Sequence, residues 1–522
     1  MEDLSNASSK TKKLTHPGSM SPREKIRLPK PVVDATLVLS AEYQKNMTSD
    51  AHKLVNYLHT RQIPVELEDR RQAEELVKQQ LMQTAEFHHV LREDGLGETS
   101  DQLEKEDSER KLNKSIMKLE RKARKLLNRS TYHWKPVNYD AYKSMLYLLG
   151  RFGTNYSSLY QIFYEIRKRN KEFQPRTLFD FGSGTSSTVW AANAIWQNSI
   201  NEHYCVDQSD SMNTLARLLL QGGDEDRPML FNGVFFKQFL PPSSQRKYDI
   251  VVSGFSLLDL PNRAERLNTL LNLWLKTNQF LVITELGTNE GWKLILEARD
   301  FILQLNEMRD EIGIQKRIDP EDLRGHVFAP CPHEKTCPRL ERRDGTPCNF
   351  RAEYEHLTSC LREVNNEKDQ YSSIRYSYVV LRKGEKSSED VAAGWPRVVR
   401  DVKLRSKLAS CHTCSVAGEL EFTAITKKKH GIELFNVARK PLKWGDLLPV
   451  KSYQWGNAES IYEMNESGTK ENVYEDTESK TAADEIRTES DNLKIDNTNC
   501  DVTETPVHRA DAIKNAVIVE ER

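Results

Sequence analysis

The spacing of hydrophobic positions changes near residue 175, and this change divides the chain into differently folded parts. From about residue 41 to 152, apolar residues recur every three or four positions, as in amphipathic helices. After Pro175, short apolar runs alternate with helical stretches. The predicted strands are 177–180, 203–207, 248–252 and 280–284, and the predicted helices are 186–198, 209–221, 262–276 and 290–307. Strands separated by helices of this length indicate βαβ units and a mostly parallel sheet.

The C-terminal third follows another pattern. A further strand is predicted at 376–381, after a cysteine-bearing interruption at 326–360. Alternating runs at 421–426 and 432–437, with a turn at Gly431 between them, suit a small antiparallel sheet or barrel.

The chain is therefore predicted to be an α/β protein with a Rossmann-like domain and additions on both sides. Its parts are a disordered N-terminus at 1–35, a helical region at 36–160, the Rossmann-like domain at 161–385, a small β domain at 386–452, and a disordered tail at 453–522. The tail has too few apolar residues to form a core.

Composition and charge narrow the function classes. The chain has 522 residues and a formal net charge of −1, but residues 456–522 hold 17 Asp and Glu against 7 Lys and Arg. The rest of the chain therefore carries +9, which is compatible with a nucleic-acid partner. The chain has no run of about 18 apolar residues, so no membrane-spanning helix is expected.

The first 35 residues contain features of a mitochondrial presequence. They hold several serines and seven Lys and Arg between Lys10 and Lys30. Glu2, Asp3 and the lack of an amphipathic helical pattern argue against a presequence.

A glycine loop follows the first predicted strand. Gly182 and Gly184 permit a tight turn and the close approach of a ligand, and Asp207 ends the next strand, where a carboxylate can bind a ribose diol. This arrangement suits a dinucleotide or S-adenosylmethionine. Ser187 replaces the third glycine of G-x-G-x-x-G, and Asp180 precedes the loop, which favours S-adenosylmethionine.

The end of the fourth strand lacks a recognisable catalytic group. The segment 252–261 has neither an Asn/Asp-Pro-Pro-Tyr/Phe clamp nor a Pro-Cys nucleophile. Asp259 could act as a base, but we interpret it as a capping residue of the helix at 262–276.

Three cysteines lie close together in the interruption. Cys331, Cys337 and Cys348 fall within 18 residues among prolines and charges, and Cys411 or Cys414 offers a fourth thiol. Four thiolates suit zinc or an iron–sulfur cluster, and the wide gaps favour a cubane cluster. His333 is an alternative zinc ligand. Such a centre would take ligands from 331–348 and from near 414, so metal binding would hold the C-terminal unit against the α/β domain. Its role would therefore be structural.

Several motifs together resemble the mitochondrial small-ribosomal-subunit methyltransferase-like family. The matching segments are 178–185, 205–207, 285–291, 329–333 with 337–338, and 444–449. The resemblance covers roughly residues 40–450. It implies a class I methyltransferase fold, S-adenosylmethionine binding, a 4Fe-4S cluster, and a role in assembling the small mitochondrial ribosomal subunit in the matrix by binding its ribosomal RNA.

The resemblance also implies the site residues. The cluster ligands would be Cys331, Cys337, Cys348 and Cys414. Cys414 is preferred over Cys411 because the family's last cysteine lies four residues before a glycine, here Gly418. The cofactor-binding residues would be Asp180, Gly182, Gly184 and Asp207. Ser186 departs from the family pattern, since relatives usually have a glycine there.

Three functions follow from these features. The first is an assembly factor with little or no methyl transfer, monomeric when free and without a membrane partner. The second is an active ribosomal RNA methyltransferase, and the third an NAD-dependent oxidoreductase. The residues expected to contact RNA are basic and lie in two regions: Lys118, Arg121, Lys122, Lys125, Arg397, Arg400, Lys427, Lys428 and Lys429.

Overall fold

The protein's structure is a computed structural model. It describes residues 16–22, 24–41, 46–66, 136–241, 246–316, 318–342, 345–358, 370–387 and 390–450, together with isolated positions between 68 and 121. The predicted disordered tail lies outside these residues. Within the described ranges, no helix combines the length and the apolar character needed to cross a bilayer.

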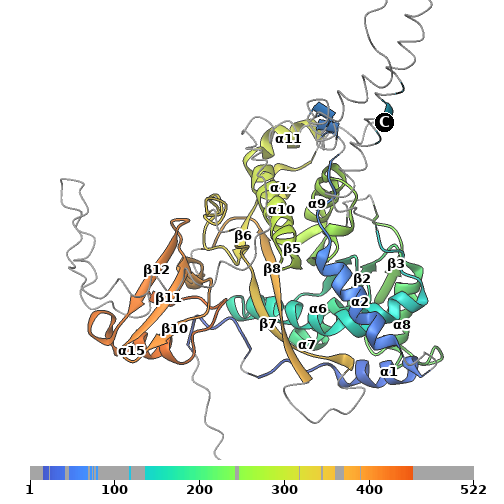
Figure 1. Cartoon of the computed structure of the whole chain (residues 1–522), viewed down its shortest axis with the longest axis horizontal. Coiled ribbons are helices and arrows are strands. Elements are labelled where there is room, and N and C mark those ends of the chain that lie inside the picture. Colours follow the sequence, from blue (N-terminus) through green and yellow to red (C-terminus); the bar gives the residue numbers. More distant parts are fainter. Residues whose placement is uncertain are drawn as a thin grey trace, which may run out of the picture.

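The centre of the molecule is an eight-stranded sheet (Figure 1). Its strands are β1 (Thr177–Phe181), β2 (Glu202–Val206), β3 (Val234–Lys237), β4 (Tyr248–Gly254), β5 (Thr277–Leu286), β6 (Gly325–Ala329), β7 (Phe350–Glu355) and β8 (Tyr371–Lys383). The order is β3-β2-β1-β4-β5-β8-β6, and β7 also pairs with β8. Strands β1 to β5 pair in parallel, whereas β8 is antiparallel to its neighbours β5, β6 and β7.

Helices cover both faces of this sheet. They are α1 (Lys30–Ser40), α2 (Met47–Thr60), α6 (Ala141–Arg169), α7 (Ser187–Trp196), α8 (Asp210–Leu220), α9 (Arg263–Lys276), α10 (Asn289–Glu307), α11 (Arg309–Lys316) and α12 (Pro320–Leu323). Successive strand residues point to opposite faces. Leu178 therefore packs with α6 and α7, and Phe179 packs with α9 and α10 in a second core.

The parallel strands and their helices confirm the predicted α/β alternation. Strands β3, β6 and β7 were not expected from the pattern. Helix α6 crosses the boundary that the sequence places at residue 160, so the helical region and the Rossmann-like domain share one continuous element.

The N-terminal segment is ordered where disorder was expected. The prediction of a disordered segment up to residue 35 is wrong for residues 16–22 and 24–35, because Met20, Leu28 and Val32 are buried against the rest of the protein. The Leu28 N–H donates to Glu355 at 2.7 Å. These contacts join residues far apart in the chain, so local composition does not reveal them.

The C-terminal unit is a second, smaller sheet (Figure 1). It contains β9 (Arg397–Val398), β10 (Lys403–Arg405), β11 (Leu408–Cys414) and β12 (Leu420–Ile425), with helix α15 (Lys427–Arg439) packed on one face. The prediction of a strand at 432–437 is wrong, since these residues belong to α15. Their buried apolar side chains are Leu434, Phe435 and Val437, which pack against the sheet, whereas Ile432 is exposed.

Candidate functional site

The glycine loop adopts the tight turn that the sequence predicts. Gly182 and Gly184 have φ values of +69° and +50°, and the N–H groups of Gly182 and Ser183 donate to the Val206 carbonyl at 2.8 and 3.0 Å. A Cβ atom added at Gly182 would lie 2.4 Å from the Ser256 Cβ. The loop therefore requires glycine at 182 for both its backbone conformation and its packing.

Ser186 adopts a conformation that glycine accommodates more easily. Its φ is +59° and ψ is +30°, in the left-handed region, directly before α7. The residue is also fully buried. Glycine, which the resemblance leads us to expect at this position, would adopt this backbone with less strain, because a β-carbon is unfavourable in left-handed backbone.

Asp207 binds the glycine loop. One carboxylate oxygen accepts the Gly184 N–H at 2.8 Å, and the other accepts the Ser209 N–H at 2.9 Å. Burial raises the pKa of Asp207, and the two backbone hydrogen bonds partly oppose this. Each oxygen keeps a second lone pair, so the carboxylate can hold the loop and also accept a hydrogen bond from a ligand.

Asp180 lies behind the loop and is almost completely buried, with 1% of its surface exposed. Burial raises its pKa to about 7, against a hydrogen bond from Thr188, and the nearby Asp207 charge raises it further. Among the described atoms, its Oδ2 has no hydrogen-bond partner, and the same holds for the hydroxyls of Ser183 and Thr185. Buried polar atoms without partners are rare in proteins and indicate where a ligand could supply them.

Two more acidic residues lie at the same edge of the sheet. Glu285, near the end of β5, accepts the Leu257 N–H at 2.9 Å, and burial raises its pKa to about 7, with the Asp259 charge adding to the effect. Asp259 forms an ion pair with Arg61. The interpretation of Asp259 as a helix cap is wrong, because the Asn262 side chain caps α9 by accepting the Glu265 N–H at 2.8 Å.

Residues 61–66 lie across this edge, which the sequence did not indicate. Arg61 is buried at the end of α2 and pairs with Asp259. The Ile63 N–H donates to Glu290 at 3.2 Å, and Glu66 accepts the Arg263 N–H at 2.7 Å. A charged residue such as Arg61 is not distinguished by its local sequence, so only the tertiary contacts identify it.

The structure brings the four predicted cysteines into one region. The described cysteine thiols influence one another electrostatically: the charges of Cys331, Cys337 and Cys348 all raise the pKa of Cys414, although burial is the larger cause. Cys337 and Cys348 pack beside Trp292. The Cys414 sulfur also lies 3.4 Å from His333 Nε2.

Cys411 lies apart from this group. It is fully buried among the apolar residues between β11 and α15, and burial alone raises its pKa to about 12. Cys411 and Cys414 are three residues apart on one strand, so they face opposite sides of the sheet. The described residues contain no group of three or more His, Cys, Asp or Glu side chains arranged to hold a metal ion.

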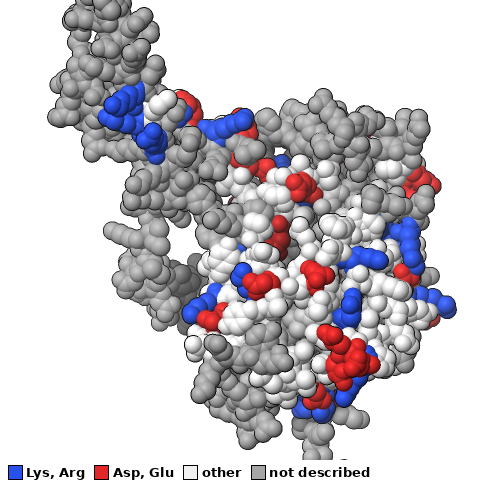
Figure 2. Space-filling model, turned by 90° about the vertical axis from the view of Figure 1, so that its right-hand side faces the viewer, with Lys and Arg blue, Asp and Glu red and all other residues white. Residues whose placement is uncertain are grey.

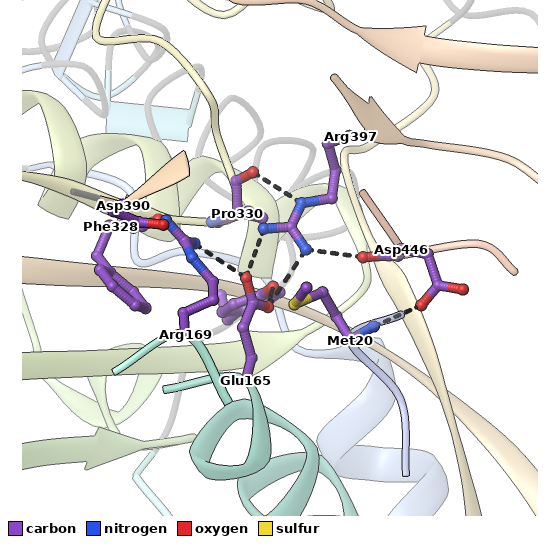
Figure 3. Close-up of polar contacts among 10 residues, drawn as sticks. Met20, Glu165, Arg169, Phe328, Pro330, Asp390, Arg397 and Asp446 are labelled. Carbon is purple, nitrogen blue, oxygen red and sulfur yellow. Dashed lines mark hydrogen bonds and ion pairs between the residues drawn. The ribbon is translucent and has the colours of Figure 1, made fainter. Parts of the chain in front are cut away.

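A buried ion network joins the C-terminal unit to the α/β unit beside Cys331 (Figure 3). Arg397 Nη2 donates to Glu165 Oε1 at 2.6 Å, and its Nε and Nη1 donate to the carbonyls of Pro330 and Gly445 at 2.9 and 2.7 Å. Burial alone would raise the pKa of Glu165, but Arg397 and then Arg169 hold it below its ordinary value.

Further residues complete this network. Arg169 donates to Glu165 at 3.2 Å, to Asp390 at 2.7 Å and to the Phe328 carbonyl at 2.6 Å. The Tyr378 hydroxyl donates to the second Glu165 oxygen at 2.8 Å. Met20 and Asp446 add an N–H···O bond of 2.7 Å nearby (Figure 3). Because every charge here has a partner, the network fixes how the two units pack.

The residues predicted to contact RNA are placed differently from one another. Arg397 has 1% of its surface exposed, so its prediction is wrong: the guanidinium is buried against Glu165. Arg400 is half-buried, whereas Lys118, Arg121 and Lys427–Lys429 are exposed. Lys122 and Lys125 lie outside the described residues. The lysines at 427–429 form the first turn of α15 rather than a strand edge.

The side of the molecule away from the C-terminal unit has no single charge sign in its described part. Figure 2 shows Lys and Arg side chains interspersed with Asp and Glu there. The C-terminal unit is a better candidate for binding a polyanion than this side of the molecule. Its residues 397–450 hold eleven Lys and Arg and five Asp and Glu.

The strand order, the antiparallel β8, the glycine turn after β1 and the acid after β2 define a class I methyltransferase fold. The chain belongs to the Rsm22 family, whose model, described as mitochondrial small ribosomal subunit Rsm22, matches residues 141–449. It is 36% identical over 437 residues to the human ribosome assembly protein METTL17, mitochondrial, and the match covers 83% of this chain and 85% of that protein. The ribosome assembly protein RSM22, mitochondrial, of Saccharomyces cerevisiae is 21% identical over an alignment of 416 positions, and the match covers 57% of this chain and 65% of that protein.

The matches to solved structures are more distant. A putative RNA methyltransferase from Pyrococcus horikoshii is 12% identical, with 44% of this chain and 83% of that protein covered at a TM-score of 0.23. Magnesium protoporphyrin IX methyltransferase from Synechocystis, with bound S-adenosylmethionine, is 12% identical, with 48% and 88% covered at a TM-score of 0.26. The family model and the human relative confirm the predicted family, and the strand order confirms the predicted fold class. The human and Saccharomyces cerevisiae relatives are mitochondrial proteins, as expected for this chain.

Proposed function

We propose that this protein is an assembly factor of the mitochondrial small ribosomal subunit that acts in the matrix, is monomeric when free and binds ribosomal RNA. The observation that carries this proposal is the 36% identity to a human mitochondrial ribosome assembly protein over 83% of the chain. The basic C-terminal unit supports an RNA partner, because phosphate groups are bound chiefly by Lys and Arg.

The residues at the glycine loop fit S-adenosylmethionine. The cradle at Gly182 has no space for a side chain, and the buried Oδ2 of Asp180 lacks a partner in the described structure. Asp207 is placed to accept hydrogen bonds from a ribose while it holds the loop. When bound, S-adenosylmethionine would supply an electrophilic methyl group.

Weak or absent methyl transfer is the second part of the proposal. Asp259 follows β4, at the edge of the sheet where class I methyltransferases usually place their chemistry, and it is paired with Arg61. Glu285 accepts the Leu257 N–H and is buried. Each carboxylate is thus held by another part of the chain, and the segment 252–261 carries neither an Asn/Asp-Pro-Pro-Tyr/Phe clamp nor a Pro-Cys nucleophile. These two observations support weak or absent methyl transfer.

The four cysteines support a structural 4Fe-4S cluster, with zinc as the alternative. Zinc at about 2.3 Å from each sulfur holds four sulfurs within about 3.8 Å of one another. A cubane binds each thiolate through a different iron, so its four sulfurs lie farther apart than those around zinc. The described side chains include no group arranged to hold a single metal ion, and the proposal rests on the gathering of the four cysteines in one region. Arg299 and Arg339 lie beside the thiols and would partly balance the charge of a thiolate cluster.

The proposal is tested by RNA crosslinking and methyl-transfer assays on the same protein. Crosslinks to small-subunit ribosomal RNA without methyl incorporation from S-adenosylmethionine are the expected result. Methyl incorporation that Gly182→Arg abolishes would contradict the inactive assembly factor and favour the alternative, an active ribosomal RNA methyltransferase. That alternative is motivated by the intact glycine loop, and it predicts a modified nucleotide that disappears in Asp207→Ala at unchanged protein level.

A further inference from the structure

The C-terminal sheet has one packed face and one open face. The packed face forms a core with α15, made of Ala409, Cys411, Ile425, Leu434 and Phe435. Because side chains alternate along a strand, His412 lies on the opposite face of β11. Phe422 of β12 is its direct antiparallel partner and lies on the same open face.

His412 and Phe422 form an aromatic pair on this open face. Their ring centroids are 4.9 Å apart at an interplanar angle of 53°. Phe422 is 61% exposed, although phenylalanine usually packs in a core. On one side of the aromatic pair, the next residues of this face are Ser410 and Ala424, which are small. On the other side they are Cys414 and Leu420.

Cationic side chains surround the aromatic pair. Lys403 and Arg405 of β10 pair with Ser410 and Leu408, which places them on the same face, and both are exposed. Four cations lie close enough to His412 to oppose its protonation after the larger effect of burial: Arg400, Lys403, Arg342 and Arg339. Residues 397–450 carry a formal excess of six positive charges. The ligand that this face fits has both negative charge and exposed flat rings.

Building on the proposed RNA-binding function, we infer that this open face holds a single-stranded segment of RNA. An unpaired base stacks on Phe422 beside His412, and the phosphates on either side contact Lys403, Arg405 and Arg342. A duplex does not fit this chemistry, because its bases are already stacked on one another and present no ring face. Stacking on aromatic side chains within a positively charged surface is the usual way proteins bind unpaired bases.

The face is also tied to the candidate metal centre. Cys414 lies two residues beyond His412 on β11 and on the same side of the sheet. The position of the aromatic pair is therefore fixed by the same strand that supplies a cysteine to the group at Cys331, Cys337 and Cys348.

The test uses the full-length protein and a fluorescent single-stranded oligoribonucleotide of about 12 nucleotides, within the length that small sheet modules cover. Fluorescence anisotropy should show that Phe422→Ala binds on the order of 5- to 150-fold more weakly, as expected for one lost stacking contact. Phe422→Trp should bind close to wild type because it keeps a ring. The matched control is Phe239→Ala, which removes a 76% exposed phenylalanine from the α/β unit and should leave affinity unchanged.

Salt dependence separates stacking from charge. The double variant Lys403→Gln/Arg405→Gln should reduce the slope of log K against log salt by about 1.4, since each single-strand phosphate contact contributes about 0.7. Phe422→Ala should lower the affinity and keep the slope. An equal loss of affinity for a hairpin duplex in Phe422→Ala would contradict a single-stranded ligand.

The outcomes also separate this inference from the proposed function. Wild-type protein that binds no RNA would overturn both. RNA binding that is normal in Phe422→Ala, with an unchanged unfolding midpoint, would overturn only the open-face inference. If that variant kept RNA affinity but lost association with the small subunit, the face would contact a protein, and the inference would be wrong.

Discussion

The junction between the two units and the glycine loop both bury charged or polar groups, but they satisfy them differently. At the junction, Glu165 receives hydrogen bonds from Arg397, Arg169 and Tyr378. At the glycine loop, Asp180 is equally buried, yet its Oδ2 has no partner among the described atoms.

The pKa values record the same contrast. The guanidiniums at the junction hold the pKa of Glu165 below its ordinary value in spite of burial, whereas burial raises the pKa of Asp180 to about 7. At the junction every charged side chain has an oppositely charged partner, although the Nε of Arg169 has no hydrogen-bond partner among the described atoms. Such a network supports a structural role, because removal of one member leaves another charge unpaired. An incompletely satisfied group beside a positive-φ turn suits a place where a ligand completes the hydrogen bonding.

The largest effect is expected from removal of a candidate metal ligand at the junction. Cys414→Ser should abolish bound iron or zinc and lower the free energy of unfolding on the order of 5 kcal/mol, since metal binding is coupled to folding. Iron, sulfide and zinc analysis after anaerobic purification measures this directly. Cys411→Ala is the control: it lies in the core facing α15, so it should cost about 1 kcal/mol and keep the metal. Equal metal loss in both variants would contradict the assignment.

The second-largest loss of stability is expected from breaking the ion pair between Arg397 and Glu165. Arg397→Met leaves Glu165 buried with fewer partners and should lower the free energy of unfolding by about 3–5 kcal/mol, measured by urea denaturation. Adding Glu165→Gln to Arg397→Met should cost less than Glu165→Gln does alone, because the two side chains interact. Additive losses would show that the pair is not coupled. The exposed Lys428→Gln should have no measurable effect.

A smaller loss is expected at the glycine loop. Gly182→Ala introduces a Cβ 2.4 Å from that of Ser256 at a φ of +69°, so we expect destabilisation of about 2–4 kcal/mol and loss of S-adenosylmethionine binding by calorimetry. Gly384→Ala is the matched control, because its φ is +79° and its Cβ would meet no atom within 4 Å. It should lose only about 1 kcal/mol. Similar losses of stability in both variants would show that the close approach of Ser256 to position 182 adds nothing to the cost of the backbone conformation.

The raised pKa of Asp180 predicts a pH dependence of stability. Its carboxyl titrates near 4 when unfolded and about 7 when folded, so between these values the folded state binds more protons. The free energy of unfolding should therefore fall as pH rises from about 4 to 7, by about 1 kcal/mol per pH unit for this group. Urea titrations at several pH values should show a flatter profile for Asp180→Asn. An unchanged profile would contradict the assignment of the pKa to burial.

The smallest effect is a gain in stability. Ser186→Gly relieves a left-handed serine at φ +59° and should stabilise the protein by about 0.5–1 kcal/mol after the greater flexibility of unfolded glycine is subtracted. Thermal unfolding measures the shift. Ser187→Gly, one residue later in α7, should instead be destabilising, because glycine is unfavourable in a helix. A loss of stability in Ser186→Gly would mean that its side chain makes a contact worth more than the strain.

Much of the α/β unit could be predicted because its signals are local. The runs that became β1, β2, β4 and β5 alternate with helical patterns, and the glycines at 182 and 184 mark a turn that few other residues adopt. Neighbours in the chain determine these features, so they are visible in one sequence. The preference for Cys414 over Cys411 came instead from the resemblance to the family, and the structure places the two on opposite faces of β11.

The tertiary structure decided which groups each of the following side chains contacts. Arg397 and Arg400 differ little in local sequence, yet one is buried against Glu165, and the other lies beside His412. The apolar run at 432–437 suits a strand or a helix, and packing against β11 and β12 selects the helix. Arg61 reaches Asp259 across 198 positions of the chain. The free energy of burying a charge or an apolar face depends on groups that the fold brings from elsewhere in the chain. This free energy therefore cannot be predicted from the local sequence around the buried residue.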